Sequence, residues 1–310
     1  MSAPRLPALG FGAAQLGNLY RETSDEEAAG AVQAAWDGGI RLFDTAPHYG
    51  LGTSERRLGA LLAEYPREEY LLSTKVGRLL EPGPGTGDDS AHGFAVPDHH
   101  VRRWDMSETG IRRSHADSVE RLGLDAVDIL YLHDPEEGPT EQAFADALPT
   151  LVAMREEGLV TQVGVGSKDV DVLTRAVRTG MVDVIMLSGR YTLLEQPAAR
   201  ELLPACREHG VEVVAVSVFN SGILSRPQVA EDARYEYAGA PVELLERARQ
   251  LAALARRHGA ELPDLALRYP LRHPAISSVV LGMRTGDQVR QNLERMAREI
   301  PEELWQAIDG

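Results

Sequence analysis

Apolar segments that could form strands alternate along the chain with segments that could form helices, and this alternation constrains the fold most. The apolar segments carry little polar alternation, which is typical of strands covered on both faces in a parallel sheet. The strand candidates are 6–14, 40–43, 70–76, 127–132, 160–165, 182–187, 211–218 and 276–281, and the helix candidates are 25–37, 54–64, 108–122, 141–157, 169–178, 198–209, 242–258 and 286–297. Eight such units closing on themselves predict an α/β fold, a single-domain (β/α)₈ TIM barrel over residues 1–310.

Two helix starts and one long connection can be predicted in more detail. Ser24 should cap the first helix, with Glu27 completing a capping box, and Thr53 or Ser54 should cap the second. The segment from Gly77 to Ser107 is too long for a structureless connection in a compact domain unless it serves function. We expect it to lie over the mouth of the pocket.

Charge and composition exclude several partners. The net charge is −15, from 32 basic and 47 acidic residues, which repels nucleic acid. Cys206 is the only cysteine, so neither an internal disulfide nor a cysteine-based zinc site can form within one chain. The chain shows neither a signal-peptide pattern nor an apolar run of the ~20 residues that span a membrane. We therefore expect a cytoplasmic protein that acts on a small molecule, with its oligomeric state left open.

Three other sites are weighed and disfavoured. Gly10, Gly12 and Gly17 do not give the spacing of a Rossmann dinucleotide fingerprint, and no Tyr-x-x-x-Lys motif indicates a short-chain dehydrogenase. His92, Asp98, His99 and His100 could suggest a metal, yet their spacing matches no known ligand frame. We expect no metal.

Four polar residues fall at or just beyond the ends of consecutive strand candidates: Asp44, Tyr49, Lys75 and His133. In a (β/α)₈ barrel the carboxyl ends of the strands face one common pocket. Each residue alone is as well explained by a capped turn, a surface tyrosine or a satisfied strand-end histidine. The four together favour a catalytic site.

These residue types suit acid/base chemistry on a carbonyl group. Lys75 is one of only two lysines, the other being Lys168, in a chain that otherwise uses arginine. A lysine ammonium against a tyrosine hydroxyl favours the phenolate and lowers the tyrosine pKa. Tyr49 could then protonate a carbonyl oxygen or deprotonate an alcohol, with Asp44 holding the lysine. His133 would orient the substrate oxygen or relay a proton.

The motifs Phe-Asp-Thr-Ala-Pro-His-Tyr at 43–49, Ser-Thr-Lys-Val-Gly at 73–77 and Asp-Ile-Leu-Tyr-Leu-His-Asp-Pro at 128–135 resemble the aldo-keto reductase superfamily. Segments 189–196 and 218–224 most resemble its L-fucose and D-threo-aldose 1-dehydrogenase branch, and pyridoxal 4-dehydrogenases are similar. The resemblance implies a catalytic tetrad of Asp44, Tyr49, Lys75 and His133, and hydride transfer between NADP or NAD and the carbonyl or hemiacetal carbon of an aldose or similar compound.

The resemblance also implies binding residues. Arg284 could take a 2′-phosphate or stack on the adenine, but Gly282 and Gln288 stand where many NADP-dependent relatives place basic residues, so the choice of NAD or NADP stays open. Lys168 could reach the nicotinamide carboxamide or a phosphate, but a solvated loop lysine is the better interpretation. The cofactor would contact Gly12, Ala13, Asp44, Ser167, Ser188, Phe219, Ser221, Leu224, Gly282, Met283, Arg284, Gln288 and Asn292, and the substrate would contact Tyr20, His48 and Trp104.

Two other functions remain open on the sequence. One is a generalist or secondary-metabolism aldehyde or ketone reductase that uses NADPH, because fold alone does not determine substrate. The other is a cofactor-binding regulatory subunit without catalysis. The intact tetrad argues against the second. For Trp104, a packing anchor for the long segment is as good an interpretation as a substrate contact.

Overall fold

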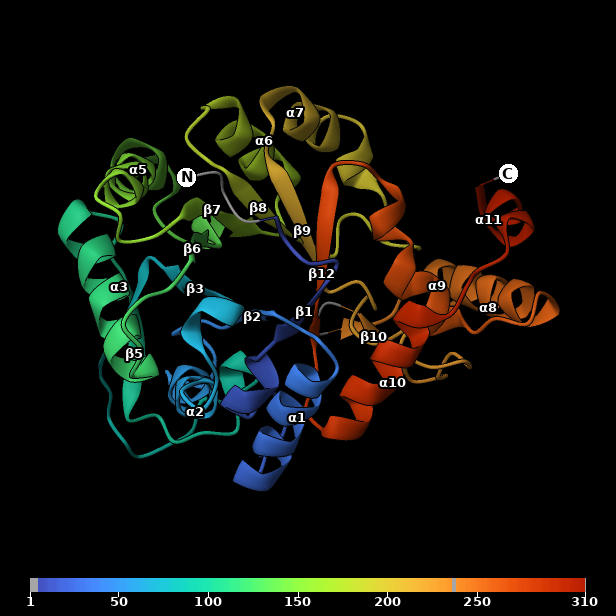
Figure 1. The fold of residues 1–310 in the computed structure, drawn as a ribbon, viewed down its shortest axis with the longest axis horizontal. Helices are drawn as coiled ribbons and strands as arrows, with labels where there is room; N and C mark the ends of the chain where they lie inside the picture. Colours follow the sequence, from blue (N-terminus) through green and yellow to red (C-terminus); the bar gives the residue numbers. More distant parts are fainter. Residues whose placement is uncertain (1–4, 236–237, 310) are drawn as a thin grey trace.

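The computed structural model describes residues 5–235 and 238–309, and its centre is a closed barrel of eight parallel strands (Figure 1). Around the barrel the order is β1-β12-β9-β8-β7-β6-β3-β2. The barrel strands therefore lie side by side in the order in which they follow one another in the chain, and the last pairs with the first. The predicted (β/α)₈ fold is confirmed. The strands are β1 (Leu9–Gly12), β2 (Leu42–Asp44), β3 (Leu71–Val76), β6 (Ile129–His133), β7 (Gln162–Ser167), β8 (Val184–Ser188), β9 (Glu212–Val216) and β12 (Ile276–Gly282).

Helices surround the barrel on its outside (Figure 1). They are α1 (Asp25–Asp37), α2 (Thr53–Leu62), α3 (Glu108–Leu122), α4 (Thr140–Gln142), α5 (Leu148–Glu156), α6 (Val170–Arg178), α7 (Leu202–His209), α8 (Val242–Arg257), α9 (Leu262–Arg268), α10 (Gly286–Ala297) and α11 (Glu302–Asp309). A π-helical stretch, Ala143–Ala147, joins α4 to α5. Short 3₁₀ helices occupy Ala14–Gly17, Arg67–Glu69, Ser90–His92, Pro135–Glu137, Pro197–Ala199 and Pro270–Arg272.

The barrel is filled by side chains and is not a pore. Tyr131, Met186 and Val214 belong to the cluster inside the strands, as expected for a barrel of eight strands. A larger cluster joins the outer faces of the strands to the helices. This packing leaves only the strand ends and their loops available for a site.

The segment between β3 and α3 is an ordered hairpin rather than an irregular loop. Strands β4 (Arg78–Pro82) and β5 (His100–Trp104) pair antiparallel in it. Phe94, from the connection between them, lies 5.4 Å from His48 and 6.2 Å from Tyr49, between ring centres. The segment therefore covers the mouth of the barrel, as its length predicted. A second antiparallel pair of strands, β10 (Arg234–Tyr235) with β11 (Ala238–Gly239), follows β9.

Local signals predicted some helix boundaries and missed others. Ser24 caps α1 and forms the capping box with Glu27. The predicted cap of α2 was wrong: the helix begins at Thr53, and Gly52 in the left-handed conformation precedes it. An added side chain at Gly52 would come within 2.7 Å of Arg121 and 3.0 Å of Arg56. The predicted helix 198–209 is a 3₁₀ turn followed by α7. Neither α9 nor α11 was predicted.

Candidate active site

Three of the four predicted catalytic residues lie at the ends of adjacent barrel strands. Asp44 ends β2, Lys75 is the penultimate residue of β3, and His133 ends β6. These strands are neighbours in the order β6-β3-β2. Parallel strands bring their carboxyl ends to the same edge, so residues separated by up to 89 positions in the chain meet in one place.

Asp44 and Lys75 form a buried ion pair. The Nζ atom of Lys75 lies 2.7 Å from Oδ2 of Asp44 and donates to the Thr45 carbonyl oxygen at 2.9 Å. Ser73 donates to the other carboxylate oxygen at 2.7 Å. Asp44 is 3% exposed and Lys75 is 2% exposed. Burial alone would lower the pKa of Lys75, but the Asp44 charge reverses this and raises it, so the ammonium stays protonated.

Tyr49 lies above this pair. Lys75 Nζ is 4.7 Å from the centre of the Tyr49 ring. Burial raises the pKa of Tyr49, and the charge of Lys75 only partly opposes the rise. Lys75 thus acts in the predicted direction, but the net shift of the Tyr49 pKa is upward, because desolvation of the phenolate outweighs attraction to the cation. The hydroxyl is protonated at neutral pH, with a buried cation positioned to favour its ionised form.

Two neutral histidines face the tyrosine. The ring centres of His133 and Tyr49 are 6.0 Å apart, and those of His48 and His133 are 5.6 Å apart. Burial, and then nearby cations, lower the pKa of His133 well below its usual value and that of His48 to about 2. Both imidazoles are therefore neutral, and each has one N–H to donate.

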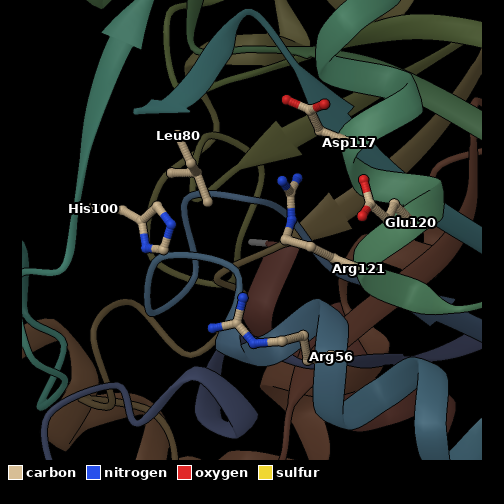
Figure 2. Close-up of a pocket in the computed structure, with 6 residues that line it drawn as sticks. All are labelled: Arg56, Leu80, His100, Asp117, Glu120 and Arg121. Carbon is tan, nitrogen blue, oxygen red and sulfur yellow. The ribbon is translucent and has the colours of Figure 1, made fainter. Parts of the chain in front are cut away.

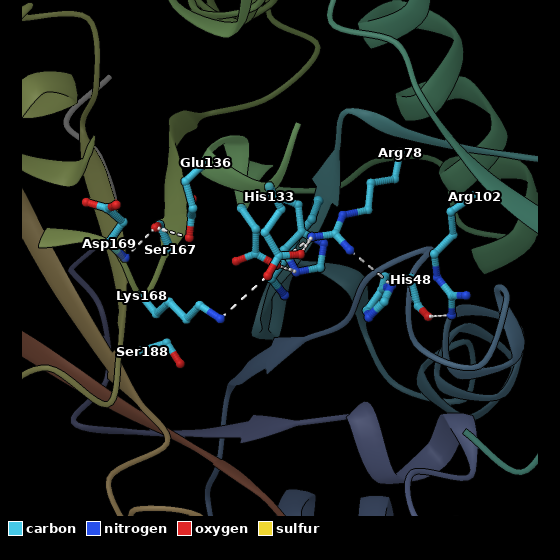
Figure 3. Close-up of polar contacts among 12 residues, drawn as sticks. His48, Arg78, Arg102, His133, Glu136, Ser167, Lys168, Asp169 and Ser188 are labelled. Carbon is cyan, nitrogen blue, oxygen red and sulfur yellow. Dashed lines mark hydrogen bonds and ion pairs between the residues drawn. The ribbon is translucent and has the colours of Figure 1, made fainter. Parts of the chain in front are cut away.

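Figure 3 shows that Arg78 joins several groups around these histidines. This arginine, 6% exposed, donates to Asp134 at 2.7 Å and to Glu137 at 3.1 Å. Its guanidinium also lies 3.4 Å from Nδ1 of His48. Sequence reasoning missed both Arg78 and Asp134. The available signal was their position: Arg78 directly follows the motif at 73–77, and Asp134 directly follows His133 within the motif at 128–135.

The predicted substrate residues differ in location. His48 lies in the ring of polar groups described above. Trp104 packs against Arg78, whose guanidinium is 4.4 Å from the ring centre, and the ring also lies close to Gly138. The structure thus places Trp104 as an anchor between the hairpin and the loop after β6. Tyr20 is 71% exposed and lies against Gly93.

The predicted cofactor residues are concentrated on the other half of the barrel mouth. They come mainly from the ends of β7, β8, β9 and β12, which are consecutive in the wall. An extended cofactor along this half would have one end beside the tetrad. The loop after β9 is strained there: Ser217, Asn220 and Ser221 have positive φ angles. Oδ1 of Asn220 is buried and has no hydrogen-bond partner among the described residues. Such strain and an orphaned acceptor fit a ligand-binding loop.

Several of these residues are buried in the apolar core or already use their polar groups within the described part of the chain. Met283 and Leu224 are buried in the apolar core, and Ala13 has its N–H and C=O bonded to Asp44 and Ser54. Ser167 donates to Glu136 at 2.6 Å and accepts from the N–H of Asp169 at 2.8 Å (Figure 3). Of the rest, Gly12, Asp44 and Asn292 are buried, Ser188 and Phe219 are half-buried, and Ser221, Gly282 and Gln288 are exposed.

The guanidinium of Arg284 is already hydrogen-bonded to groups of the protein. Its guanidinium donates to the Arg21 carbonyl oxygen at 3.0 Å, to the Leu19 carbonyl oxygen and to the Thr23 hydroxyl, and only 8% of the residue is exposed. Its backbone N–H donates to the Gln288 side chain at 2.7 Å. This arrangement does not present the guanidinium to a 2′-phosphate.

Lys168 is exposed and lies 3.6 Å from Glu137 (Figure 3). This ion pair connects the exposed ammonium to the Arg78 network, because Glu137 also pairs with Arg78.

Other features lie away from this site. Figure 2 shows a hollow lined by Arg56, Leu80, His100, Asp117, Glu120 and Arg121, none of which is a predicted catalytic or binding residue. Within residues 5–235 and 238–309, no three His, Cys, Asp or Glu side chains are grouped to hold a metal ion. In the same ranges no helix has the length and apolar character needed to cross a membrane.

Comparison with known proteins agrees with this geometry. The aldo/keto reductase family model matches residues 8–310. A D-threo-aldose 1-dehydrogenase from Pseudomonas sp is 53% identical over 303 residues, which cover 97% of this chain and 92% of that protein. A pyridoxal 4-dehydrogenase from Microbacterium luteolum is 36% identical, with coverage of 97% and 92%.

Among solved structures, the holo form of the aldo-keto reductase AKR11C1 from Bacillus halodurans superposes with a TM-score of 0.77 at 26% identity, covering 100% of this chain and 95% of that one. The barrel, the strand-end residues and these matches lead to one conclusion. The chain belongs to the aldo/keto reductase family, whose members are oxidoreductases that use NADP or NAD.

Proposed function

We propose that this protein is an aldose 1-dehydrogenase, which oxidises the hemiacetal carbon of a cyclic sugar or a similar hydroxy-carbonyl compound to a lactone. The observation that carries the chemistry is the buried Asp44–Lys75 pair beneath Tyr49. The relative that is 53% identical supports the substrate class. Residues 1–310 would form one catalytic domain.

In this proposal Tyr49 moves the proton. Its hydroxyl donates to the carbonyl oxygen during reduction, and its phenolate accepts the hydroxyl proton during oxidation. Lys75 stabilises the phenolate, and Asp44 holds the ammonium in place through the 2.7 Å contact. When bound, the nicotinamide supplies or accepts the hydride.

His133 would orient the substrate oxygen. Its neutral ring has one N–H, and its Nε2 atom is 3.4 Å from Asp134 Oδ2, longer than an ordinary hydrogen bond. The N–H is therefore weakly held and can donate to a substrate oxygen. Neutrality matters here, because a second buried cation beside Lys75 would be costly.

Cofactor contacts are proposed for exposed or half-buried groups at the ends of β8, β9 and β12. Ser188, Phe219, Ser221, Gly282 and Gln288 meet this condition. Ser167 would contribute by holding Glu136. Arg284 would hold the loop that contains Leu19 and Arg21, and its effect on the cofactor would be indirect.

The test is cofactor reduction, followed by nicotinamide absorbance, with L-fucose, D-arabinose, other aldoses and pyridoxal, and with NAD⁺ and NADP⁺ compared. Aldehydes with NADH and NADPH form the parallel panel. Oxidation of one or more aldoses is expected. Reduction of aldehydes alone would replace the proposal with a generalist reductase, and cofactor binding without turnover would indicate a regulatory subunit.

Tyr49→Phe tests the acid/base assignment. It should lower kcat by about 10²–10⁴-fold and leave cofactor Kd unchanged. Tyr65→Phe is the matched control, because Tyr65 stacks on Trp36 of α1 and its ring survives the change. Activity of Tyr49→Phe within a few-fold of the Tyr65 variant would refute the role.

A further inference from the structure

Asp134 has an unusual conformation for its place beside the candidate active site. It directly follows His133, and its φ of 40° lies in the left-handed region that non-glycine residues rarely adopt. Its side chain is 27% exposed, although that of His133 is only 8% exposed. The carboxylate of Asp134 is thus more accessible than the imidazole of the residue before it, and its backbone is strained.

The two oxygens of this carboxylate differ in their contacts. Oδ2 accepts from Arg78 at 2.7 Å and lies 3.4 Å from Nε2 of His133. In the described parts of the chain no group donates to Oδ1, and this oxygen is not enclosed. One oxygen is therefore fixed by the protein while the other can accept a hydrogen bond from a ligand.

Arg78 prevents the carboxylate from turning away. The guanidinium also pairs with Glu137 at 3.1 Å and lies over the ring of Trp104. Trp104 is fixed in turn, because even a methyl group on Gly138 would come within 2.8 Å of its ring. The orientation of Oδ1 is set by packing rather than by solvent.

An ionised carboxylate accepts hydrogen bonds and cannot donate them. Burial raises the pKa of Asp134 to about 6, against the opposing charge of Arg78, so the group is mostly ionised at neutral pH. A hydroxyl group on the ligand would satisfy Oδ1. A purely apolar ligand would cover the oxygen and leave it without a partner, which is costly.

From this geometry we infer that Asp134 is a specificity-determining residue, whose Oδ1 accepts a hydrogen bond from a substrate hydroxyl next to the reacting carbon. Asp134 would thereby select hydroxylated carbonyl compounds over unsubstituted aldehydes. Such a hydroxyl is on the carbon next to the one that bears the substrate oxygen bonded to His133. Oδ2 of Asp134 is 3.4 Å from Nε2 of the same histidine. The inference rests on the proposed carbonyl chemistry and goes beyond it by naming the group that recognises the substrate hydroxyl.

The experiment compares glyceraldehyde with propanal, two three-carbon aldehydes that differ only in their hydroxyl groups. kcat/KM for reduction of each is measured in the full-length protein and in Asp134→Asn, whose amide presents an NH₂ in place of Oδ1. The wild type should prefer glyceraldehyde. Asp134→Asn should reduce this preference by about 10–100-fold while kcat/KM for propanal changes by less than about threefold.

Glu137→Gln is the matched control, because it removes the other carboxylate bonded to Arg78 without altering Asp134. It should change the preference by less than about threefold, because Arg78 keeps its bond to Asp134. Asp134→Ala repeats the test if the Asn variant is unstable, since Arg78 keeps its pair with Glu137. Thermal unfolding of each variant shows whether it is folded.

The outcomes separate this inference from the proposed function. An unchanged preference in both Asp134 variants would overturn the inference alone. An equal loss for both aldehydes would overturn it too, because Asp134 would then act through His133. Failure of the wild type to oxidise any sugar, with the preference for glyceraldehyde lost in Asp134→Asn, would overturn the proposed substrate and support the inference.

Discussion

Replacing Lys75 by methionine removes the buried cation beside the Tyr49 ring while keeping most of the side-chain volume. Nζ lies 4.7 Å from the ring centre. At an effective dielectric constant of about 20, Coulomb's law gives about 3.5 kcal/mol for the attraction between Lys75 and a phenolate at this distance. If that stabilisation is fully present in the transition state, its loss lowers kcat/KM by about 400-fold.

The same substitution destabilises the fold for a different reason. Asp44 would keep its bond from Ser73 but lose its cation in a buried site, and breaking a buried ion pair typically costs about 3–5 kcal/mol. The double variant Asp44→Asn/Lys75→Met removes both charges. It should recover much of the free energy of unfolding, because no unpaired charge remains buried.

Activity and stability together distinguish the two roles of Lys75. The assay measures kcat/KM with the best substrate of the panel, and urea unfolding monitored by circular dichroism gives the free energy of unfolding. We expect the double variant to be more stable than Lys75→Met and equally inactive. Recovery of activity along with stability would refute the reasoning, since Lys75 would then only support the fold. Activity of Lys75→Met within tenfold of the wild type would refute it as well.

Three further predictions follow from the site. Because burial raises the pKa of Tyr49 and oxidation needs the phenolate, kcat/KM for oxidation should rise with pH through the alkaline range while that for reduction falls; a flat profile in both directions would contradict the assignment. The glyceraldehyde preference should increase between pH 5 and 7 as Asp134, with its pKa of about 6, ionises among Arg78, Lys75, His133, Glu136 and Glu137, and it should be independent of pH in Asp134→Asn. Arg284→Gln should lower the melting temperature, because two backbone carbonyls lose their donor, and should change kcat/KM for NADP and NAD alike; a selective loss with NADP would show that Arg284 contacts the 2′-phosphate.

The barrel and the meeting of Asp44, Lys75 and His133 could be predicted because both depend on local patterns. Apolar runs between amphipathic segments determine where strands and helices form. Once the strands are parallel, their ends must converge, so residues at strand ends become neighbours whatever lies between them in the chain. The capping box of Ser24 and Glu27 is local in the same way.

Other features were decided only by tertiary packing. The bond between Arg78 and Asp134 joins residues 56 positions apart, and no periodicity indicates it. An added side chain at Gly52, the residue before α2, would come within 2.7 Å of Arg121, which belongs to another helix. Such contacts form when elements pack, so a pattern read along one segment cannot contain them.

Electrostatic properties also required the folded structure. The sequence indicated that Lys75 would act on Tyr49, but the direction of the tyrosine pKa depends on how much water burial removes from the phenolate. Arg284 was a plausible phosphate ligand until the loop around Leu19 and Arg21 supplied its carbonyl oxygens. The sequence alone determined the types of chemical group at the barrel mouth. The tertiary structure decided which of them are charged, which are already paired, and which remain available to a ligand, because burial and distance are set only when the barrel closes.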